Sequence, residues 1–512
     1  MFLDADQCYR ALRTHDARFD GRFFVGVGTT RIYCRPVCTA KTPLAKNCRY
    51  FPSAAAAETQ GFRPCLRCRP ELAPGYATVD ANRRLAQAAA GQIEDGRLED
   101  ASLAGIASHL GVTDRHLRRV FQQEFGVSPV DYAQTQRLLL AKRLLTDTAL
   151  PVLDVAMASG FASLRRFNDL FRTRYRMTPG ELRKSAPTRA DADRMSFDLA
   201  YRPPYDWPAM LAFLEKRAIA GVEAVDGRRY RRTVRISCAR RDARARGTEG
   251  TERARNGIEG TERAPSVAEG RQAVTTGWIE IAPSPRKSAL RVTASASFAQ
   301  AVPALLARVK SFLDLACRPD EIAAALGPLA RDHPGLRLPG AIDGFEIAVR
   351  AILGQQVTVA AATTIAGRFA KALGTPIDTP HDGLGRLFPT ASLVASTAPS
   401  DIAALGIIAT RARAIVALAR EVDAGTLRLD PGAAVDETLA ALERIPGVGP
   451  WTAQYIAMRA LAWPDAFPHP DVAVLKALRE TNGRQALARA EAWRPWRSYA
   501  VLHLWKSLEN AP

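Results

Sequence analysis

Apolar residues recur at helical spacing from about residue 84 to 185. They fall at intervals of three and four, as in Leu103, Ala107, Leu110 and again in Leu117, Val120, Phe121. This period is typical of a helix with one buried face. The segment LRRVFQQEFGVSP (117–129) aligns with FNDLFRTRYRMTP (167–179) at an offset of 50 residues. The pattern therefore predicts two copies of one helical unit.

The pattern changes after this repeat. Residues 186–196 are typical of a linker, and SFDLAYR (196–202) is typical of a strand. The segments RRTVRIS (231–237) and GWIEIAP (277–283) predict two strands that an insertion over 238–276 interrupts. The insertion contains the repeat GTEGTERARN–GIEGTERAPS, whose charged, Gly-rich composition predicts disorder. From about 299 onward the pattern is mostly helical again.

A chain of 512 residues is too long for a single core. We predict a multidomain protein that is mainly α with α+β parts. The expected domains are a small cysteine-rich module over 1–80, a helical repeat over 84–186, an α+β domain over 194–336 with the insertion, and an all-α domain over 337–512.

The formal net charge of the chain is +19. Such an excess favours a polyanionic partner, because Lys and Arg displace counterions from a phosphate backbone; an Arg-rich composition inherited from a high-GC genome is the alternative. No stretch approaches the ~20 apolar residues of a membrane span, and MFLDADQCYRALRTHD lacks the apolar run of a signal peptide. We therefore expect a cytoplasmic protein without a membrane partner.

Four cysteines form two close pairs near the N-terminus. Cys34 and Cys38 are four residues apart, and Cys65 and Cys68 are three apart. Two such pairs suit a tetrahedral zinc site, and a reducing compartment favours metal binding over disulfides. Residues 18–70 carry ten basic and two acidic residues, which predicts a basic surface around the metal. Spacing alone favours a purely structural site, since most all-cysteine zinc sites are closed.

Two runs in this module, TTRIYCRPVC (29–38) and GFRPCLRC (61–68), resemble the N-terminal domain of the Ada methylphosphotriester repair proteins. The resemblance implies one zinc ion, both structural and catalytic, on the four cysteines. It further implies that Cys34 accepts a methyl group from a phosphotriester in DNA. Chemistry supports this, because a zinc-bound thiolate is deprotonated without a base.

The helical repeat has the features of two helix-turn-helix units. In LAGIASHLGVTDRHLRRVF (103–121), Gly111 suits the turn and Thr113 or Asp114 can cap the next helix. The recognition helices are predicted at 114–124 and 164–174, and they carry Arg115, Arg118, Arg119, Arg165 and Arg166. A generic helical bundle is the alternative. The region resembles the DNA-binding domain of AraC-type transcription activators, which implies promoter DNA and RNA polymerase as partners.

A glycine-rich hairpin marks the C-terminal domain. LERIPGVGPWTAQYIAM (442–458) places Pro446, Gly447 and Gly449 between two helical patterns. Such a hairpin, followed by a helix N-terminus, suits a phosphate; an ordinary Gly-Pro turn is the alternative. About twenty residues later Asp471 opens an apolar helix, so it is a candidate helix cap as well as a candidate catalytic carboxylate. Asp465 is the rival carboxylate.

Together the hairpin and Asp471 resemble the helix-hairpin-helix DNA glycosylase superfamily. Three segments, 201–223, 334–359 and 493–505, further resemble the AlkA 3-methyladenine glycosylases. The resemblance implies Asp471 as the catalytic residue, a base pocket lined by Trp451, Tyr455 and Trp505, and a loop carrying Gln355 and Gln356 that enters the duplex. Relatives can have Leu as the wedge where this chain has Gln356.

One position indicates the mechanism. Lyase-type relatives have a Lys two residues after the second hairpin glycine, where this chain has Trp451. An indole cannot form a Schiff base, so we expect a monofunctional, hydrolytic enzyme of the DNA-3-methyladenine glycosylase II type.

The sequence thus predicts a monomer that repairs double-stranded DNA with alkylation damage and couples methyl acceptance to transcription activation. No Pro-Cys-His-Arg motif occurs, so O6-methylguanine repair is not expected. The alternative is a methylation-responsive regulator whose C-terminal half binds DNA without catalysis.

Overall fold

The computed structural model describes residues 5–15, 23–51, 54–68, 70, 85–86, 88–90, 92–93, 102–184, 193–239, 272–285 and 288–509. The chain folds into two compact units, Met1–Gln136 and Arg137–Pro512. Most of the predicted linker and the middle of the predicted insertion, 240–271, lie outside the described residues. Within the described ranges, no helix combines the length and apolarity that crossing a bilayer requires.

The first unit opens with a small sheet. Its strands have the order β3-β1-β2-β4, where β1 is Phe24–Val27, β2 is Ile32–Cys34, β3 is Cys48–Phe51 and β4 is Arg63–Pro64. Helix α1 (Ala5–Thr14), the 3-10 turn η2 (Ala45–Asn47) and α2 (Ala54–Thr59) accompany it. Gly26 on the central strand faces Phe51 and Phe62, and a Cβ there would come within 2.6 Å of the Phe51 ring. The close aromatic packing therefore requires glycine at this position.

The first helix-turn-helix lies in the same unit. Helix α5 (Leu103–His109) leads through Gly111, at φ +70°, to α6 (Asp114–Phe125). The Thr113 hydroxyl accepts a hydrogen bond from the His116 amide and caps α6, because an N-cap oxygen satisfies an otherwise unpaired amide. The predicted recognition helix is confirmed to within one residue. Helix α7 (Pro129–Asp147) runs on across the boundary between the two units.

The second copy lies in the second unit. It consists of α8 (Val152–Ala158), α9 (Leu164–Tyr175) and α10 (Pro179–Lys184), with Ser163 capping α9 as Thr113 caps α6. Its apolar residues do not form a separate core. Phe167 and Phe171 belong to the same buried cluster as Phe197 on strand β5. The Arg143 guanidinium of α7 also donates to the Asp198 carbonyl at 2.7 Å.

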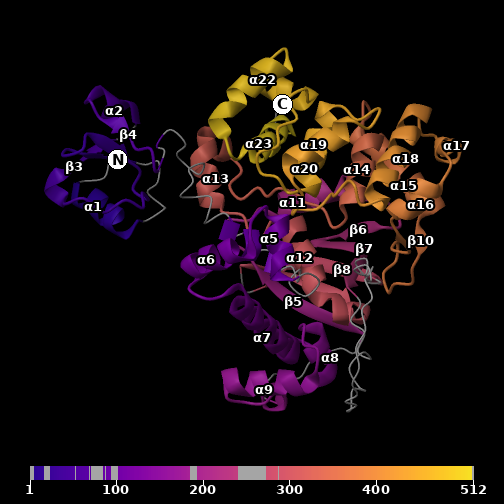
Figure 1. Ribbon diagram of the computed structural model, residues 1–512. Coiled ribbons are helices and arrows are strands. Elements are labelled where there is room, and N and C mark those ends of the chain that lie inside the picture. The colour runs from indigo at the N-terminus through magenta and orange to yellow at the C-terminus, as the bar shows by residue number, and fades with distance from the viewer. Residues whose placement is uncertain are drawn as a thin grey trace, which may run out of the picture. The chain divides into compact units, whose positions relative to one another are not determined.

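A five-stranded antiparallel sheet follows, in the order β5-β9-β8-β7-β6. Figure 1 labels β5, β6, β7 and β8 of this sheet. Its strands are β5 (Arg194–Ala200), β6 (Glu223–Asp226), β7 (Arg229–Ala239), β8 (Gln272–Pro283) and β9 (Ala289–Ser295). Helices α11 (Trp207–Glu215) and α12 (Val302–Phe312) pack on β7, and η4 (Ala296–Ala301) packs on α8. The predicted boundaries of the insertion are wrong, because β7 and β8 pair as far as Ala239 and Gln272.

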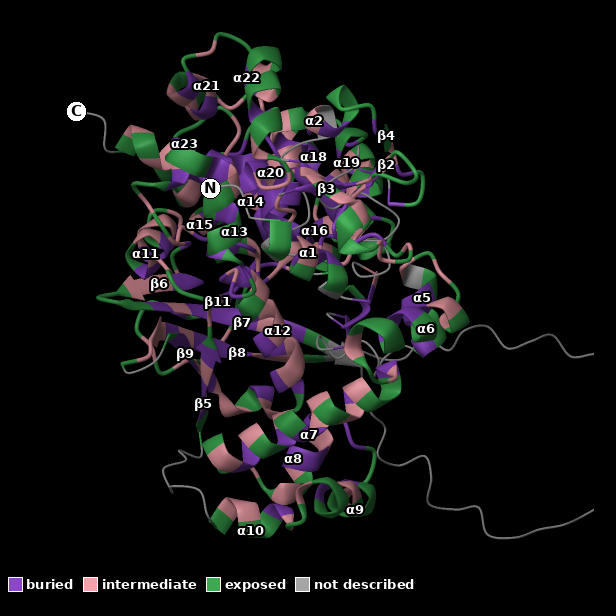
Figure 2. Cartoon of the chain, turned by 90° about the vertical axis from the view of Figure 1, so that its left-hand side faces the viewer, coloured by how far each residue is buried: buried purple, intermediate pink, exposed green. Residues whose placement is uncertain are grey.

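The rest of the chain is almost entirely helical. Buried residues, purple in Figure 2, gather in α14 (Gly344–Leu353) and α20 (Pro450–Ala460). The predicted all-α character from about 337 onward is confirmed apart from the two-residue strands β10 (Thr375–Pro376) and β11 (Arg386–Leu387). The other elements are α13 (Pro319–Leu326), η5 (Gly327–Ala330), α15 (Val359–Leu373), α16 (Ala391–Ser396), α17 (Pro399–Ala403), α18 (Ala409–Asp423), α19 (Val435–Glu443), α21 (Val472–Leu478), α22 (Gly483–Ala490), η6 (Glu491–Trp493) and α23 (Arg497–Glu509).

Candidate active site and zinc centre

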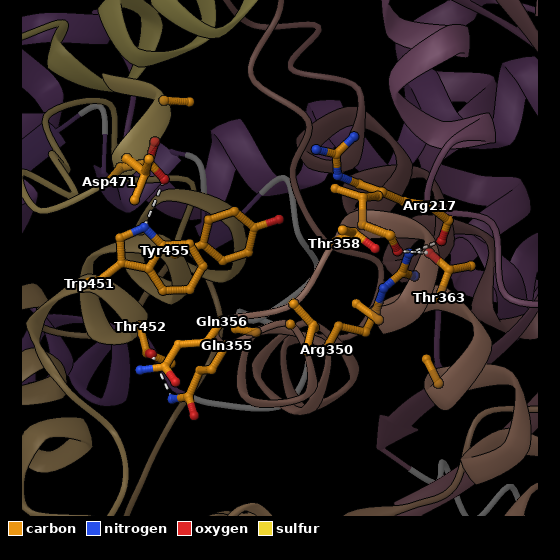
Figure 3. A pocket seen from close by; sticks show the side chains of 18 of the residues that line it. Arg217, Arg350, Gln355, Gln356, Thr358, Thr363, Trp451, Thr452, Tyr455 and Asp471 are labelled. Atoms are coloured by element: carbon orange, nitrogen blue, oxygen red, sulfur yellow. Dashed lines mark hydrogen bonds between the residues drawn. The ribbon is translucent and has the colours of Figure 1, made fainter. Parts of the chain in front are cut away.

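A cavity of about 1330 Å³ opens among the helices of the second unit. The loop between α14 and α15, the hairpin between α19 and α20, and the start of α21 contribute to its walls, with residues of α23 and the residue Arg217 after α11. It brings together the predicted residues Gln355, Gln356, Gly447, Gly449, Trp451, Tyr455, Asp471 and Trp505. Residues that lie far apart in the sequence therefore converge on one site (Figure 3).

The Asp471 carboxylate is fixed by three N–H donors. The indole of Trp451 donates to Oδ2 at 2.8 Å, and the indole of Trp505 donates to Oδ1 at 3.1 Å. The Val474 amide donates to Oδ1 at 2.9 Å, which makes Asp471 the N-cap of α21. The cap that the sequence offered as an alternative role is therefore present, and the carboxylate is half-buried at the cavity wall at the same time.

Aromatic rings line the cavity beside this carboxylate. Trp451 and Tyr455 lie one turn apart on α20 and stack with 5.3 Å between ring centroids and 11° between planes. Trp505 on α23 approaches Tyr455 at 6.4 Å. Each ring is only half-buried, so an aromatic ligand could gain stacking contact there.

The hairpin is held from the α14–α15 loop. The Gln355 amide nitrogen donates to the Gly447 carbonyl at 2.8 Å and to the Thr452 hydroxyl at 2.9 Å (Figure 3). Gly447 has a φ of +91°, a conformation that a side chain would strain. Gln356, in contrast, is exposed and itself adopts a φ of +53°. The two adjacent glutamines therefore have different roles. The Gln355 side chain binds the hairpin, whereas Gln356 is exposed at the surface of the loop.

The rival carboxylate occupies a different environment. Asp465 is 4% exposed and does not line the cavity. Arg497 donates to Oδ1 at 2.7 Å and to Oδ2 at 3.0 Å, and Arg494 donates to Oδ2 at 2.5 Å. Two guanidinium groups thus neutralise Asp465 and occupy both its oxygens, so it suits a structural ion pair better than contact with a substrate.

Two arginines that the sequence analysis did not identify form part of the cavity wall. Arg217 and Arg350 both line it. Arg350 donates to Glu223 at 2.8 Å and to Glu346 at 2.9 Å. Both arginines lie in segments that resemble the AlkA glycosylases, but no spacing rule brings positions 133 residues apart to one wall. Only the fold reveals them, because it brings the Arg350 guanidinium within hydrogen-bond distance of the Arg217 carbonyl.

The four predicted cysteines converge in the first unit. The sulfur atoms of Cys34, Cys38, Cys65 and Cys68 all lie within 4.8 Å of one another. Tetrahedral zinc with Zn–S bonds of ~2.3 Å places its sulfurs about 3.8 Å apart, so the cluster fits a zinc ion. The fold of the sheet produces this arrangement, because Cys34 ends β2 and the Cys65 amide donates to the Tyr33 carbonyl at 3.0 Å.

The cysteines are not equivalent. Cys38, Cys65 and Cys68 are buried, whereas Cys34 is half-buried and is the most accessible of the four. Arg35, which is fully buried, donates its amide to the Cys68 sulfur at 3.4 Å. Hydrogen bonds with Cys38 and Cys68, together with burial, raise the pKa of Cys34. Four thiolates cannot share this space alone, and a divalent cation is what allows them to ionise together.

The predicted recognition helices present their arginines to solvent. Arg115, Arg118, Arg119, Arg165 and Arg166 are all exposed. Arg118 pairs with Asp114 at 3.0 Å, and Arg119 contacts the His116 ring at 3.1 Å. Exposed i,i+4 pairs of this kind contribute little to stability, so these side chains can exchange them for phosphate or base contacts.

This domain architecture is shared with known proteins. A probable bifunctional transcriptional activator/DNA repair enzyme AlkA of Mycobacterium tuberculosis H37Rv is 36% identical, over 100% of this chain and 98% of the relative. The chain belongs to this AlkA family of bifunctional activators and repair enzymes. DNA-3-methyladenine glycosylase 2 of Escherichia coli K12 is 34% identical over 60% of this chain and 96% of its own length. The bifunctional transcriptional activator/DNA repair enzyme AdaA of Bacillus subtilis is 30% identical over 35% of this chain and 82% of its own length.

The AlkA-family chain also matches four family models. They are the metal binding domain of Ada over 7–71, a helix-turn-helix domain over 106–185, the AlkA N-terminal domain over 196–343, and the HhH-GPD superfamily of base excision DNA repair proteins over 349–497. The predicted architecture and the zinc-binding character of the four-cysteine cluster are thereby confirmed.

Proposed function

We propose that this chain hydrolyses the glycosidic bond of alkylated bases such as 3-methyladenine in double-stranded DNA, with Asp471 as the catalytic residue. One observation carries the proposal: a carboxylate at the cavity wall is fixed by two indole N–H groups from the same wall. Its fixed position suits electrostatic stabilisation, which is strongest when the charged group needs no reorganisation.

The chemistry follows from charge. N-alkylation makes a purine cationic, so the base departs as a neutral molecule when the C1′–N bond breaks. Positive charge then develops on the deoxyribose, and the Asp471 carboxylate stabilises it. Water then adds to C1′, and the proton that it loses passes to the solvent. Trp451 stands where lyases have a reactive Lys, so no Schiff base forms.

The cavity supports base flipping. Extruding a base from the duplex costs a few kcal/mol. The rings of Trp451, Tyr455 and Trp505 would offset part of that cost, because an electron-rich ring attracts a cation by about 0.5–2 kcal/mol. The hairpin at Pro446–Gly449 would bind a backbone phosphate, and the exposed Gln356 would fill the vacated space.

Asp471→Asn tests this function. The variant keeps the shape of the side chain but loses the charge, so release of 3-methyladenine from alkylated duplex DNA should be abolished. Duplex affinity should stay near the wild-type value, because the hairpin is intact. A wild-type excision rate in the Asn variant would leave Asp471 as a helix cap only and would overturn the proposal.

We further propose that Cys34 senses damage. Its sulfur forms an S–CH₃ bond while the O–CH₃ bond of a DNA methylphosphotriester breaks, which leaves a phosphodiester. Its greater exposure among the four zinc-site cysteines supports this role. The change from thiolate to thioether removes one negative charge, so affinity for DNA phosphates rises.

Methylation thereby favours promoter binding by the two helix-turn-helix units and recruitment of RNA polymerase. We propose that the protein acts as a monomer in the cytoplasm with one zinc ion that is structural and catalytic. Peptide mass spectrometry after incubation with methylphosphotriester DNA tests the sensor. The added methyl should be on Cys34, and a methyl on Cys38 or Cys65 would contradict the assignment.

A further inference from the structure

A second groove runs along a neighbouring face of helix α15, beside the large cavity. Its volume is about 910 Å³, and it is lined by α15, by the loop that leads from β10 to β11 and by the segment between α11 and β6. Among the described residues, Thr363 alone lines both this groove and the large cavity. The groove is therefore a separate surface, for which the function proposed above gives no role.

Basic side chains dominate the lining of this groove. Arg368 and Lys371 of α15 are exposed, and Arg386 of β11 is half-buried. Within the described part of the chain, no carboxylate lies within 4.0 Å of the charged groups of these three side chains. Asp382 is the one carboxylate on the lining, and burial lowers the pKa of His381, so that its imidazole is neutral at neutral pH. The groove therefore attracts an anion.

The two cations of α15 belong to one stripe along the helix. Thr364, Arg368 and Lys371 follow one another at intervals of four and three residues, so their side chains share one face. At 1.5 Å per residue, this stripe is about 10 Å long. Charges arranged along a line suit an extended polyanion better than a single compact ion.

The groove adjoins the large cavity at two points. Thr363 lines both. The Arg368 guanidinium also lies beside the loop between α17 and α18, because a Cβ at Gly406 would come within 3.0 Å of its Nη1 atom. Ile408 and Thr410, which follow Gly406, line the large cavity. A nucleic-acid strand whose base enters the cavity would therefore reach the groove with its neighbouring phosphates.

We propose that this groove binds the phosphodiester backbone of the substrate duplex beside the flipped nucleotide, with Arg368 and Lys371 each neutralising one phosphate. The inference rests on the proposed function but concerns a surface outside the base pocket. Contacts of this kind add affinity that falls with salt, and they fix the position of a duplex without reading its sequence. The groove thus holds the damaged strand in register with the cavity, while bond cleavage depends on Asp471.

The test separates binding from chemistry. Single-turnover release of 3-methyladenine from an alkylated duplex is followed against protein concentration at several salt concentrations, for wild type, Arg368→Gln, Lys371→Gln and the double variant. The protein concentration that gives half the maximal rate should rise, and the slope of its logarithm against log salt should fall by about 0.9 for each substitution. The maximal rate should change less than twofold, because neither cation lines the large cavity. Lys371→Arg should keep the wild-type slope, because it keeps the charge.

Arg420→Gln is the matched control. Arg420 is an exposed cation in the last turn of α18, and Lys371 is an exposed cation in the last turn of α15; both helices have 15 residues. Each substitution removes a similar favourable interaction with a helix C-terminus. Arg420 lines neither the groove nor the large cavity, so its loss should leave the salt slope unchanged.

Other outcomes would overturn the proposal. An unchanged slope in the double variant would exclude phosphate contacts in the groove, and an equal fall in Arg420→Gln would show that surface charge acts without regard to place. A lower maximal rate with an unchanged slope would mean that the substitutions act through the cavity wall. The same slopes are measured for binding of a duplex with a tetrahydrofuran abasic-site analogue, which requires no excision. A wild-type protein that releases no 3-methyladenine would therefore refute the proposed function, and the binding slopes would still decide the role of the groove.

Discussion

The four-cysteine cluster and the Asp471 site both hold anionic groups for work on DNA, but they stabilise negative charge by different means. In the cluster, four sulfurs crowd within 4.8 Å and few N–H donors reach them. At Asp471, a single carboxylate already accepts three N–H groups. The first site depends on a cation that comes from outside the chain, whereas the second is complete in the polypeptide.

Because of this difference, the cysteine cluster can lose its stabilising group by loss of zinc, whereas the Asp471 site can lose its donors only by mutation or unfolding. Metal binding supplies folding free energy to a small module, so the cluster links reactivity to the presence of zinc. The Asp471 site links reactivity to the packing of α20, α21 and α23, which bring Trp451, Asp471 and Trp505 together. Experiments that disturb the metal, the ion pairs or the indole donors should therefore affect the two sites unequally.

Zinc removal should have the largest effect. A strong chelator should unfold residues 23–68 and abolish methyl acceptance, because apparent zinc-binding free energies reach about 10–16 kcal/mol in small domains. Excision of 3-methyladenine should persist. Limited proteolysis and an excision assay on the same sample measure both. Cys65→Ser should lose zinc while Cys48→Ser keeps it, and loss of excision on chelation would contradict the separation.

Asp465→Asn should be the next most disruptive change. Arg497 is nearly as buried as Asp465, and removal of one partner leaves a buried charge without its counter-ion. We expect the free energy of unfolding to fall by about 3 kcal/mol, as measured by denaturant titration of the full chain. The exposed Asp332→Asn is the control. If the variant loses excision under conditions in which denaturant titration shows that it is still folded, Asp465 instead takes part in the reaction.

At Asp314, the loss of hydration outweighs the hydrogen bonds and the charge of Arg337 that favour the carboxylate. Asp314 is half-buried and accepts one hydrogen bond from the Tyr499 hydroxyl at 2.7 Å and one from the Leu338 amide at 3.1 Å. Burial raises the pKa of Asp314 to about 6. Because the folded pKa lies above the unfolded value, its stabilising contribution is present below pH ~4 and is lost as the pH rises through 6.

Asp314→Asn should remove this pH dependence. The wild type should lose about 3 kcal/mol relative to the variant between pH 4 and pH 8, as measured by denaturant unfolding at each pH. A pH-independent difference would show that Asp314 stays ionised in the folded protein.

The smallest expected effect concerns one donor at Asp471. Trp505→Phe removes the 3.1 Å hydrogen bond but keeps an aromatic ring and leaves the Trp451 donor in place. The single-turnover rate should fall about tenfold, or ~1.4 kcal/mol. Trp463→Phe, outside the cavity, should leave the rate unchanged. A rate that is insensitive to Trp505→Phe would mean that Trp451 and the helix cap position the carboxylate alone.

Local sequence signals predicted much of this molecule. Cysteine spacing identified four residues that the structure gathers, and the 50-residue repeat located both recognition helices, because these features depend on near neighbours. The sequence could not reveal which glutamine faces outward, since Gln355 turns inward to a carbonyl 92 positions away. Nor could it show that Arg217 and Arg350 line the same cavity wall, because that placement depends on the packing of segments far apart in the chain. The insertion boundaries were wrong because the strand pairing continues to Ala239 and Gln272, past the point where the sequence analysis placed the start and end of the insertion.

The second helix-turn-helix shares buried residues with the five-stranded sheet, and this has a consequence for inheritance. A gene divided between the helix-turn-helix and β5 would encode two products, each with an exposed apolar face around Phe171 or Phe197. Such faces promote aggregation. Substitutions on either side must also stay compatible with the other, so that the regulator and the repair enzyme evolve as one heritable unit. The first helix-turn-helix has a separate buried cluster, to which Ala133 of α7 belongs.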